Sequence, residues 1–268
     1  MTLPYPQIDP VAFELGPLQV HWYGLMYLLG FAGAWWLAVR RSERSWSPVR
    51  RRQVEDLVVY AAFGVIIGGR CGYVLFYNLD KWLADPLWLI RLWEGGMAFH
   101  GGLLGVLVAM ALFARKVNQP FLAVTDFVAP LVPIGLGLGR LGNFIGQELW
   151  GRATDMPWAM VFPRDPEQVA RHPSQLYQAF LEGLVLFIVL FYISRKPRPL
   201  GVVSGLFLLL YALFRFLVEF VRAPDAHIGY DFGGWMTRGQ LLSLPMLAVG
   251  LALIAYGYWR ASAADSGR

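Results

Sequence analysis

Cysteine, charge and familiar metal-binding motifs are all scarce in this sequence. Cys71 is the only cysteine, which excludes a disulfide framework, a zinc ribbon or an iron–sulfur site within one chain. No His-Glu-x-x-His motif, carboxylate cluster or cysteine–histidine pair is present, so we expect no metal. Only 15% of the residues are charged, whereas a soluble domain carries about 25%. The composition therefore argues against a soluble protein.

Long apolar runs take the place of the missing charges. The chain is 57% hydrophobic and has a mean hydropathy of +0.47. A membrane-spanning helix needs about 20 mostly apolar residues. Seven segments approach that length: residues 18–39, 55–77, 97–114, 121–140, 176–194, 201–220 and 239–259. The sequence thus predicts an all-α integral membrane protein, in which residues 1–268 form a single domain with seven transmembrane helices.

Basic residues mark one side of the predicted bundle. They follow alternate spans, in RRSERSWSPVRRR, in Arg115–Lys116, in RKPRP, and at Arg260 and Arg268, and these positions hold 13 of the 23 basic residues. Loops rich in Lys and Arg are usually cytoplasmic. We therefore expect an external N-terminus and a cytoplasmic C-terminus. The first ten residues, MTLPYPQIDP, do not have the features of a cleavable signal peptide. The net charge of +5 is then an orientation signal, and no nucleic acid is expected as a partner.

Three segments between spans are external in this orientation. Residues 78–96 contain three tryptophans and are typical of an interfacial segment at the lipid headgroups. Residues 141–175 are rich in proline and mixed charge, and should form a small external, periplasmic head inserted in the domain. Residues 221–238 form a third external loop.

Glycines recur at a spacing of four residues within three of the predicted spans. Small residues at this spacing let helix backbones approach closely in lipid, so we interpret them as packing positions. They are Gly64, Gly68 and Gly72, then Gly101 and Gly105, then Gly135 and Gly139.

Two charged or titratable residues stand within or beside apolar runs. Side chains of this kind usually face a partner or a cavity. Arg70 could be a structural residue, bonded to carbonyls or to a carboxylate such as Glu94 or Asp126, or it could be functional. His100 lies among four glycines in GGMAFHGGLLG, near the external end of its span, which favours a functional role over packing.

The stretch GLGLGRLGNFIGQELWG carries polar residues at the end of the fourth span. Arg140, Asn143 and Gln147 share one face if the helix continues. The glycines between them also allow the helix to end in a loop with free N–H groups. Both arrangements suit an anion.

The sixth span carries a polar stripe at Tyr211, Arg215, Glu219 and Arg222. Arg215 and Glu219 could simply neutralise each other, but Arg140 ends another span on the same side. Arginine pairs bidentately with phosphate. A phospholipid headgroup is the anion available at that depth, so we interpret the arginines as a phosphate site.

Five motifs together resemble the phosphatidylglycerol–prolipoprotein diacylglyceryl transferases of bacteria over nearly the whole chain. They are GRLGNFIGQELWGR, GGMAFHGG, HWYGLMY, RHPSQLY and FRFLVEFVRAPD. The chain has Gly146 where the family's motif usually has asparagine, so the resemblance assigns no ligand at that position. It implies an inner-membrane transferase without a cofactor, whose active site faces the periplasm. Its partners would be phosphatidylglycerol and the lipobox of a prolipoprotein signal peptide, whose cysteine thiol accepts the diacylglyceryl group as glycerol phosphate leaves.

The resemblance and the chemistry together suggest roles for the polar residues. His100 would accept the thiol proton, as a neutral imidazole can near pH 7, or would position lipid. Arg140 and Arg215 would hold the phosphate of the leaving group. The remaining candidates would bind or position substrate: Tyr23, Asn143, Glu148, Gly151, Tyr211 and Glu219.

Two other functions stay open on the residues alone. A lipid transporter or channel would explain intramembrane arginines, although the chain has no inverted repeat and its polar residues gather at one end of the spans. A phospholipid headgroup hydrolase would act on the same lipid with water as the acceptor.

Overall fold

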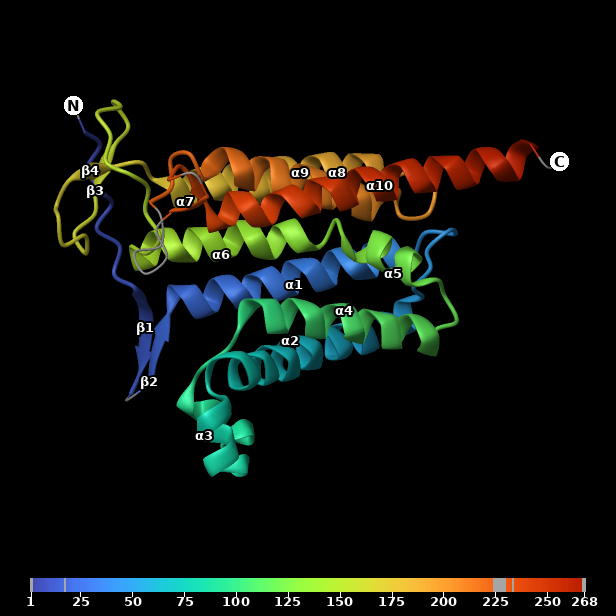
Figure 1. Cartoon of the computed structure of the whole chain (residues 1–268), viewed down its shortest axis with the longest axis horizontal. Helices are drawn as coiled ribbons and strands as arrows, with labels where there is room; N and C mark the ends of the chain where they lie inside the picture. Colours follow the sequence, from blue (N-terminus) through green and yellow to red (C-terminus); the bar gives the residue numbers. More distant parts are fainter. Residues whose placement is uncertain (1, 17, 224–229, 233, 267–268) are drawn as a thin grey trace. The chain divides into compact units, whose positions relative to one another are not determined.

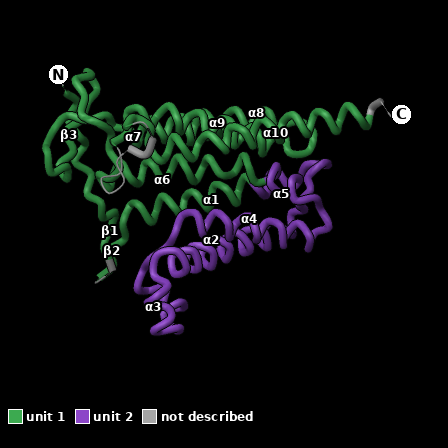
Figure 2. The backbone as a smooth tube through the Cα atoms, in the orientation of Figure 1, with its two compact units in different colours: residues 1–37, 128–268 green, residues 38–127 purple. Residues whose placement is uncertain are grey.

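Helices make up most of the computed structural model, which describes residues 2–16, 18–223, 230–232 and 234–266. Part of the predicted loop 221–238, and Arg268, lie outside these residues. The chain divides into two compact units (Figure 2). Unit 1 contains residues 1–37 and 128–268, and unit 2 contains residues 38–127.

Every predicted span contains helix. The helices are α1 (Trp22–Ser42), α2 (Val54–Tyr77), α4 (Phe99–Lys116), α5 (Phe121–Val128), α6 (Val132–Gly146), α9 (Val202–Val218) and α10 (Arg238–Ser266). The fifth predicted span is α7 (Ser174–Gln178), continued by the π-helical segment η4 (Ala179–Val185) and α8 (Leu186–Ile193). Among the described residues, five helices are long and apolar enough to cross a membrane. α5 and α6 qualify as a sixth span only together, and α9, with 17 residues, is shorter.

Short hairpins precede α1 and connect later helices, a feature that the sequence did not predict. They pair β1 (Val11–Leu15) with β2 (Leu18–His21), β3 (Met160–Val161) with β4 (Ala170–Arg171), and β5 (Tyr230–Phe232) with β6 (Met236–Thr237). The first hairpin corrects the predicted start of the first span, since residues 18–21 form a strand. Gly16 has a φ of 60°, a conformation that favours glycine, and this turn lets Leu15 pair with Leu18.

Unit 2 is built on close contact between α2 and α4. A Cβ atom added at Gly68 would lie within 3 Å of backbone atoms of Gly101 and Gly105, so no side chain fits between the two helices there. This confirms the packing prediction for the two glycine stripes in these helices.

Arg70 organises the segment that follows α2. This segment contains α3 (Leu79–Ala84) and the 3₁₀ turns η2 (Pro86–Ile90) and η3 (Leu92–Glu94). The buried guanidinium donates hydrogen bonds to the carbonyl oxygens of Trp88 at 2.6 Å, Leu89 at 2.9 Å and Arg91 at 3.1 Å, and to those of Gly95 and Gly96. Arg70 was predicted to bond either to carbonyl groups or to a carboxylate, or to be functional, and the structure shows the bonds to carbonyl groups.

Unit 1 places α6, α8, α9 and α10 side by side (Figure 1). Its core includes the buried residues Ala129, Leu186, Leu190 and Val203. The glycine prediction is wrong for Gly139, where an added Cβ would meet no described atom within 4 Å. Gly135 does allow a close approach, because a Cβ added at Gly30 of α1 would lie 3.2 Å from the Cα of Gly135. Gly137 makes another, because a Cβ there would lie 3.1 Å from the Cα of Gly183 in η4.

Of residues 141–175, predicted to form a head, the first six belong to α6, which continues to Gly146, and the last two belong to α7, which begins at Ser174. Tyr5, Phe144 and Phe162 form its apolar centre. In the same region Arg171 donates hydrogen bonds to both carboxylate oxygens of Asp165, at 2.6 and 3.1 Å. These bonds hold the pKa of the Asp165 carboxyl below its usual value.

Candidate functional site

The close approach of α6 and η4 brings Arg140 to a carboxylate that the sequence analysis missed. The NH2 atom of Arg140 lies 3.6 Å from Oε2 of Glu182, which directly precedes Gly183. The Glu182 side chain is fully buried, whereas that of Arg140 is 18% exposed. π-Helical turns such as η4 are often found at functional sites, and this one carries Glu182.

The contact between Arg140 and Glu182 is an ion pair without a hydrogen bond. Oε1 of Glu182 accepts a hydrogen bond from Nε2 of Gln178 at 3.2 Å. Oε2 has no hydrogen-bond partner among the described residues. Arg140 is therefore held by charge and not by a saturated set of hydrogen bonds.

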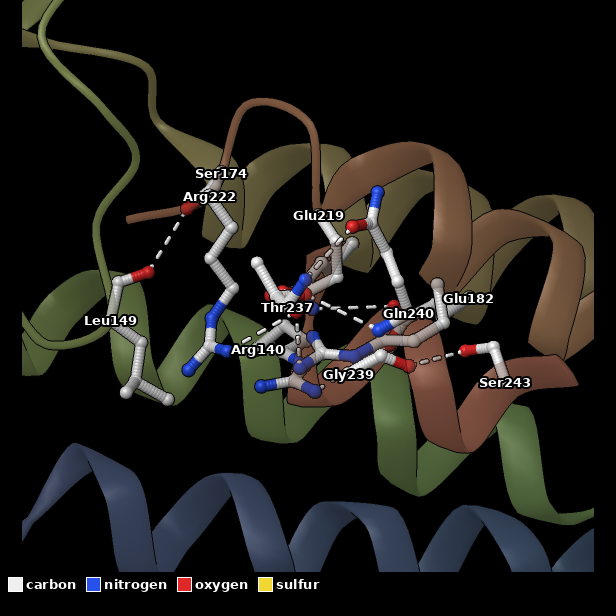
Figure 3. A network of polar contacts seen from close by, with 12 residues as sticks. Arg140, Leu149, Ser174, Glu182, Glu219, Arg222, Thr237, Gly239, Gln240 and Ser243 are labelled. Carbon is white, nitrogen blue, oxygen red and sulfur yellow. Dashed lines mark hydrogen bonds and ion pairs between the residues drawn. The ribbon is translucent and has the colours of Figure 1, made fainter. Parts of the chain in front are cut away.

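A second arginine is held far more tightly at the end of α9. NH2 of Arg215 lies 2.6 Å from Oε1 of Glu219, and NH1 of Arg222 lies 3.2 Å from the same oxygen. The hydroxyl of Thr237 donates a 2.7 Å hydrogen bond to Oε2 of Glu219 (Figure 3). Glu219 is buried and has contacts on both oxygens, while NH1 of Arg215 has no partner within the described part of the chain.

These residues form one arginine cluster, defined as Arg140, Arg215 and Arg222 with Glu182 and Glu219. Arg140 and Arg215 both lie within electrostatic range of Glu182. Arg140 makes only an ion pair with Glu182, and one nitrogen of Arg215 has no partner among the described residues, so both guanidinium groups keep hydrogen-bond donors in a largely buried place. Buried charge is costly unless it is compensated. The cluster is therefore suited to bind an anion, and the exposed fractions of Arg140 and Arg215, 18% and 15%, leave access for one.

The end of α6 agrees with the second of the two arrangements in that the helix ends in a loop. The helix stops at Gly146, and Gln147 has a φ of 56°, so Gln147 does not share a helical face with Arg140. The loop offers no free anion-binding N–H groups at its start. The N–H of Gln147 bonds to the Phe144 carbonyl at 3.1 Å, and that of Glu148 to the Asn143 carbonyl at 2.9 Å.

Two other predicted residues line a cavity of about 470 Å³ in unit 1. Tyr23, in the first turn of α1, packs its ring against Gly142 of α6, and its hydroxyl lies 3.1 Å from that of Tyr27. Glu148 lines the same cavity with an exposed carboxylate. Both side chains are thus accessible to a ligand in unit 1.

The remaining predicted residues of unit 1 are structural neighbours of the cluster. Asn143 is buried in α6, and Tyr211 stacks on Phe207 of α9 with ring centroids 5.8 Å apart. Gly151 forms an antiparallel bridge with Arg222, and a Cβ there would lie 2.6 Å from His172. Glycine at 151 therefore allows the chain to pass close to the cluster.

His100 belongs to unit 2. It is exposed in the first turn of α4, edge-on to Phe99 with ring centroids 5.6 Å apart. The arginine cluster belongs to unit 1.

Known proteins are similar to this sequence over nearly its full length. A family model described as prolipoprotein diacylglyceryl transferase matches residues 10–256. Proteins named phosphatidylglycerol–prolipoprotein diacylglyceryl transferase are similar throughout. The protein of Ectopseudomonas mendocina (strain ymp) is 60% identical, and the match covers 96% of this chain and 97% of that protein. The protein of Teredinibacter turnerae (strain ATCC 39867 / T7901) is 62% identical, and the match covers 96% of this chain and 93% of that protein. The chain belongs to this family.

In this prolipoprotein diacylglyceryl transferase family member, the sequence carries signals for three residues of the site that were not predicted. Glu182 is a lone carboxylate inside the apolar run AFLEGLVLF, and a charge in such a position is a functional candidate. Thr237 and Gln240 have the spacing of a capping box at a helix start. Neither signal identifies the partner of Glu182, which is Arg140, or that of Thr237, which is Glu219, because both contacts depend on how the helices pack.

Proposed function

We propose that this protein transfers the diacylglyceryl group of phosphatidylglycerol to the lipobox cysteine of a prolipoprotein, in the bacterial inner membrane. The names of its relatives state this class of transfer, and the available guanidinium donors of Arg140 and Arg215 support the roles proposed for these two residues. The thiol sulfur attacks the glycerol carbon that bears the phosphate ester. The C–O bond breaks, a C–S thioether forms, and glycerol phosphate leaves with the bonding electron pair.

Arg140 and Arg215 bind the lipid phosphate and stabilise the charge that develops on the leaving oxygen. A single donor aimed at a developing oxyanion is worth about 3 kcal/mol of barrier. Arg140 can turn toward a phosphate because its contact with Glu182 has no hydrogen bond to break. Arg215 keeps one unpartnered nitrogen among the described residues for the same purpose.

The other candidates have supporting roles in this proposal. A free thiol has a pKa of about 8.5, so little thiolate exists at neutral pH, and His100 accepts the proton. Glu219 orients Arg215. Substrate is bound or positioned by Tyr23, Asn143, Glu148, Gly151 and Tyr211.

The two units act as one domain of seven spans in this proposal. The N-terminus and the head at residues 141–175 are periplasmic, and the C-terminus is cytoplasmic. The active site then faces the compartment in which the acceptor cysteine is exposed. No cofactor and no nucleic acid takes part.

The test measures thioether-linked diacylglycerol on a lipobox peptide in membranes that contain labelled phosphatidylglycerol. Arg140→Ala and Arg215→Ala should each lower the rate by a factor of about 100, the usual effect of losing one oxyanion donor. Arg195→Ala, which changes an exposed arginine outside the cluster, is the matched control. Full activity of Arg140→Ala would refute the phosphate role.

Two further arms of the assay separate the alternatives. Cys71→Ser should stay active, since the acceptor thiol belongs to the substrate; an inactive variant would indicate a covalent enzyme intermediate. Release of glycerol phosphate without peptide would identify a hydrolase, and lipid flux without a thioether product would identify a transporter.

A further inference from the structure

Thr237 caps the first turn of α10. It directly precedes Arg238, and its hydroxyl oxygen accepts a hydrogen bond from the N–H of Gln240 at 3.3 Å. The side chain of Gln240 returns the interaction, since its Oε1 accepts a 3.1 Å hydrogen bond from the N–H of Thr237. This reciprocal arrangement is a capping box, which stabilises a helix start.

The hydroxyl of Thr237 does more than cap the helix. A threonine hydroxyl has one proton to donate, and here it goes to Oε2 of Glu219 at 2.7 Å. The opposite oxygen of Glu219 faces Arg215 at 2.6 Å and Arg222 at 3.2 Å. Both oxygens of the carboxylate are thus fixed, one by Thr237 at the start of α10 (Figure 3) and one by the arginines.

The residue two positions after Thr237 also limits where Glu219 can lie. A Cβ added at Gly239 would be 2.7 Å from the carboxyl carbon of Glu219. Gly239 has no side chain to fill that space, so the carboxylate rests directly against the first turn of α10. The start of α10 therefore sets the position of Glu219 through a hydrogen bond and through contact.

We propose that Thr237 is a positioning residue that sets the guanidinium of Arg215 through Glu219. The proposal rests on the function given above, in which Arg215 binds the lipid phosphate. Arg215 and Glu219 lie four residues apart on a helix, where flexible side chains can pair in several rotamers. The hydrogen bond from Thr237 selects one carboxylate orientation, and with it one position of Arg215. Gln240 contributes to the cap but makes no hydrogen bond with Glu219 within the described part of the chain, so it offers a matched control.

The experiment measures kcat and KM for phosphatidylglycerol together with the thermal midpoint. Thr237→Val removes the hydroxyl at constant shape and should lower kcat about tenfold, the rate equivalent of one hydrogen bond to a charged group. Thr237→Ser keeps the hydroxyl and should restore kcat. Gln240→Leu should lower the thermal midpoint without lowering kcat. Gly239→Ala should lower kcat with the hydroxyl still present, because its methyl group displaces Glu219.

A double-mutant cycle separates positioning from general stability. If Thr237 acts through Glu219, the effect of Thr237→Val on kcat should largely disappear in a Glu219→Gln background. The proposal would be overturned if Thr237→Val lowered kcat by the same factor in the Glu219→Gln background as in the wild type. It would also be overturned if Thr237→Val and Gly239→Ala both kept the kcat of the wild type. A wild-type protein that forms no thioether product would instead refute the proposed function, so the two failures are distinguishable.

Discussion

Among single residues, Glu182 is the one whose contribution should depend most on bound lipid. Its buried carboxylate is paired with Arg140 at 3.6 Å. Removing one partner of a buried ion pair costs about 3–5 kcal/mol, because the other charge stays behind uncompensated. A lipid phosphate on Arg140 would replace the lost charge. We therefore expect Glu182→Gln to lower the free energy of unfolding in lipid-free detergent, and added phosphatidylglycerol to recover most of the loss.

The measurement is the thermal midpoint as phosphatidylglycerol is titrated into the detergent. Glu167→Gln is the control, because Glu167 also pairs with an arginine but its side chain is 70% exposed. It should change the midpoint little and leave the lipid response as in the wild type. An equal lipid-induced shift for the wild type and Glu182→Gln would contradict the expected compensation.

His172 gives a prediction for pH at the same scale. It directly precedes the Pro173–Ser174 start of α7, its Nδ1 lies 3.1 Å from the hydroxyl of Tyr177, and burial lowers its pKa from the usual 6.5. The unfolded chain therefore binds a proton more readily than the folded one. The stability from this residue is complete above pH 6.5 and is lost as pH falls below 6.5 toward the lower folded value.

The effect can be isolated by comparing thermal midpoints at about pH 7.5 and about pH 5.5. His172→Gln should show a smaller drop on acidification than the wild type. His21→Gln, at an exposed histidine, serves as the control and should follow the wild type. An unchanged drop in His172→Gln would assign the acid sensitivity to other groups.

At the scale of elements, the pairing of α2 with α4 depends on the absence of side chains. Gly68→Ala would place a methyl group within 3 Å of backbone atoms of α4, which cannot move as a flexible side chain could. Overpacking of this kind costs about 1–3 kcal/mol. Gly135→Ala, at a helical glycine where an added Cβ meets no described atom within 4 Å, should be neutral or slightly stabilising. Chemical denaturation in detergent compares the two variants, and similar stabilities would refute the packing role of Gly68.

The same elements show how far the sequence could predict the fold. The helices followed from apolar runs of nearly membrane length, a property of each segment by itself. The strand at residues 18–21 was missed because it directly precedes the apolar run of α1, although its alternation of apolar and polar residues, LQVH, is typical of a strand. The spacing of Gly135 and Gly139 suggested contact at both positions, but an added Cβ at Gly139 would meet no described atom, and Gly137, which lies outside that spacing, faces Gly183. Spacing indicates which residues share a face and leaves open which face meets a neighbour.

The candidate site was predictable in its residue types and not in its pairings. Arg140 and Arg215 stood out because charge is rare in apolar runs. The Arg215–Glu219 pair is local and could be foreseen from helical spacing. The contacts of Arg140 with Glu182 and of Glu219 with Thr237 join separate helices, so they required the packed structure.

For the whole molecule, the charge pattern makes a prediction about orientation that does not depend on activity. Basic residues after alternate spans predict that the head is external and the C-terminal end of α10 is cytoplasmic. Because Cys71 is the only cysteine, a Cys71→Ser background allows single cysteines to report their compartment. Asp155→Cys lies in the head and Ser262→Cys lies near the end of α10, and both positions are exposed.

A maleimide that cannot cross the inner membrane should label Asp155→Cys in cells whose outer membrane has been opened. It should label Ser262→Cys only after the inner membrane is also permeabilised. Labelling of both before that step would require an even number of crossings between the two positions, which conflicts with the three spans predicted there. The reverse pattern would invert the orientation and put the head, with the acceptor peptide, on the cytoplasmic side. Since the prediction rests on arginine and lysine placement alone, it stands or falls separately from the roles proposed for the arginine cluster.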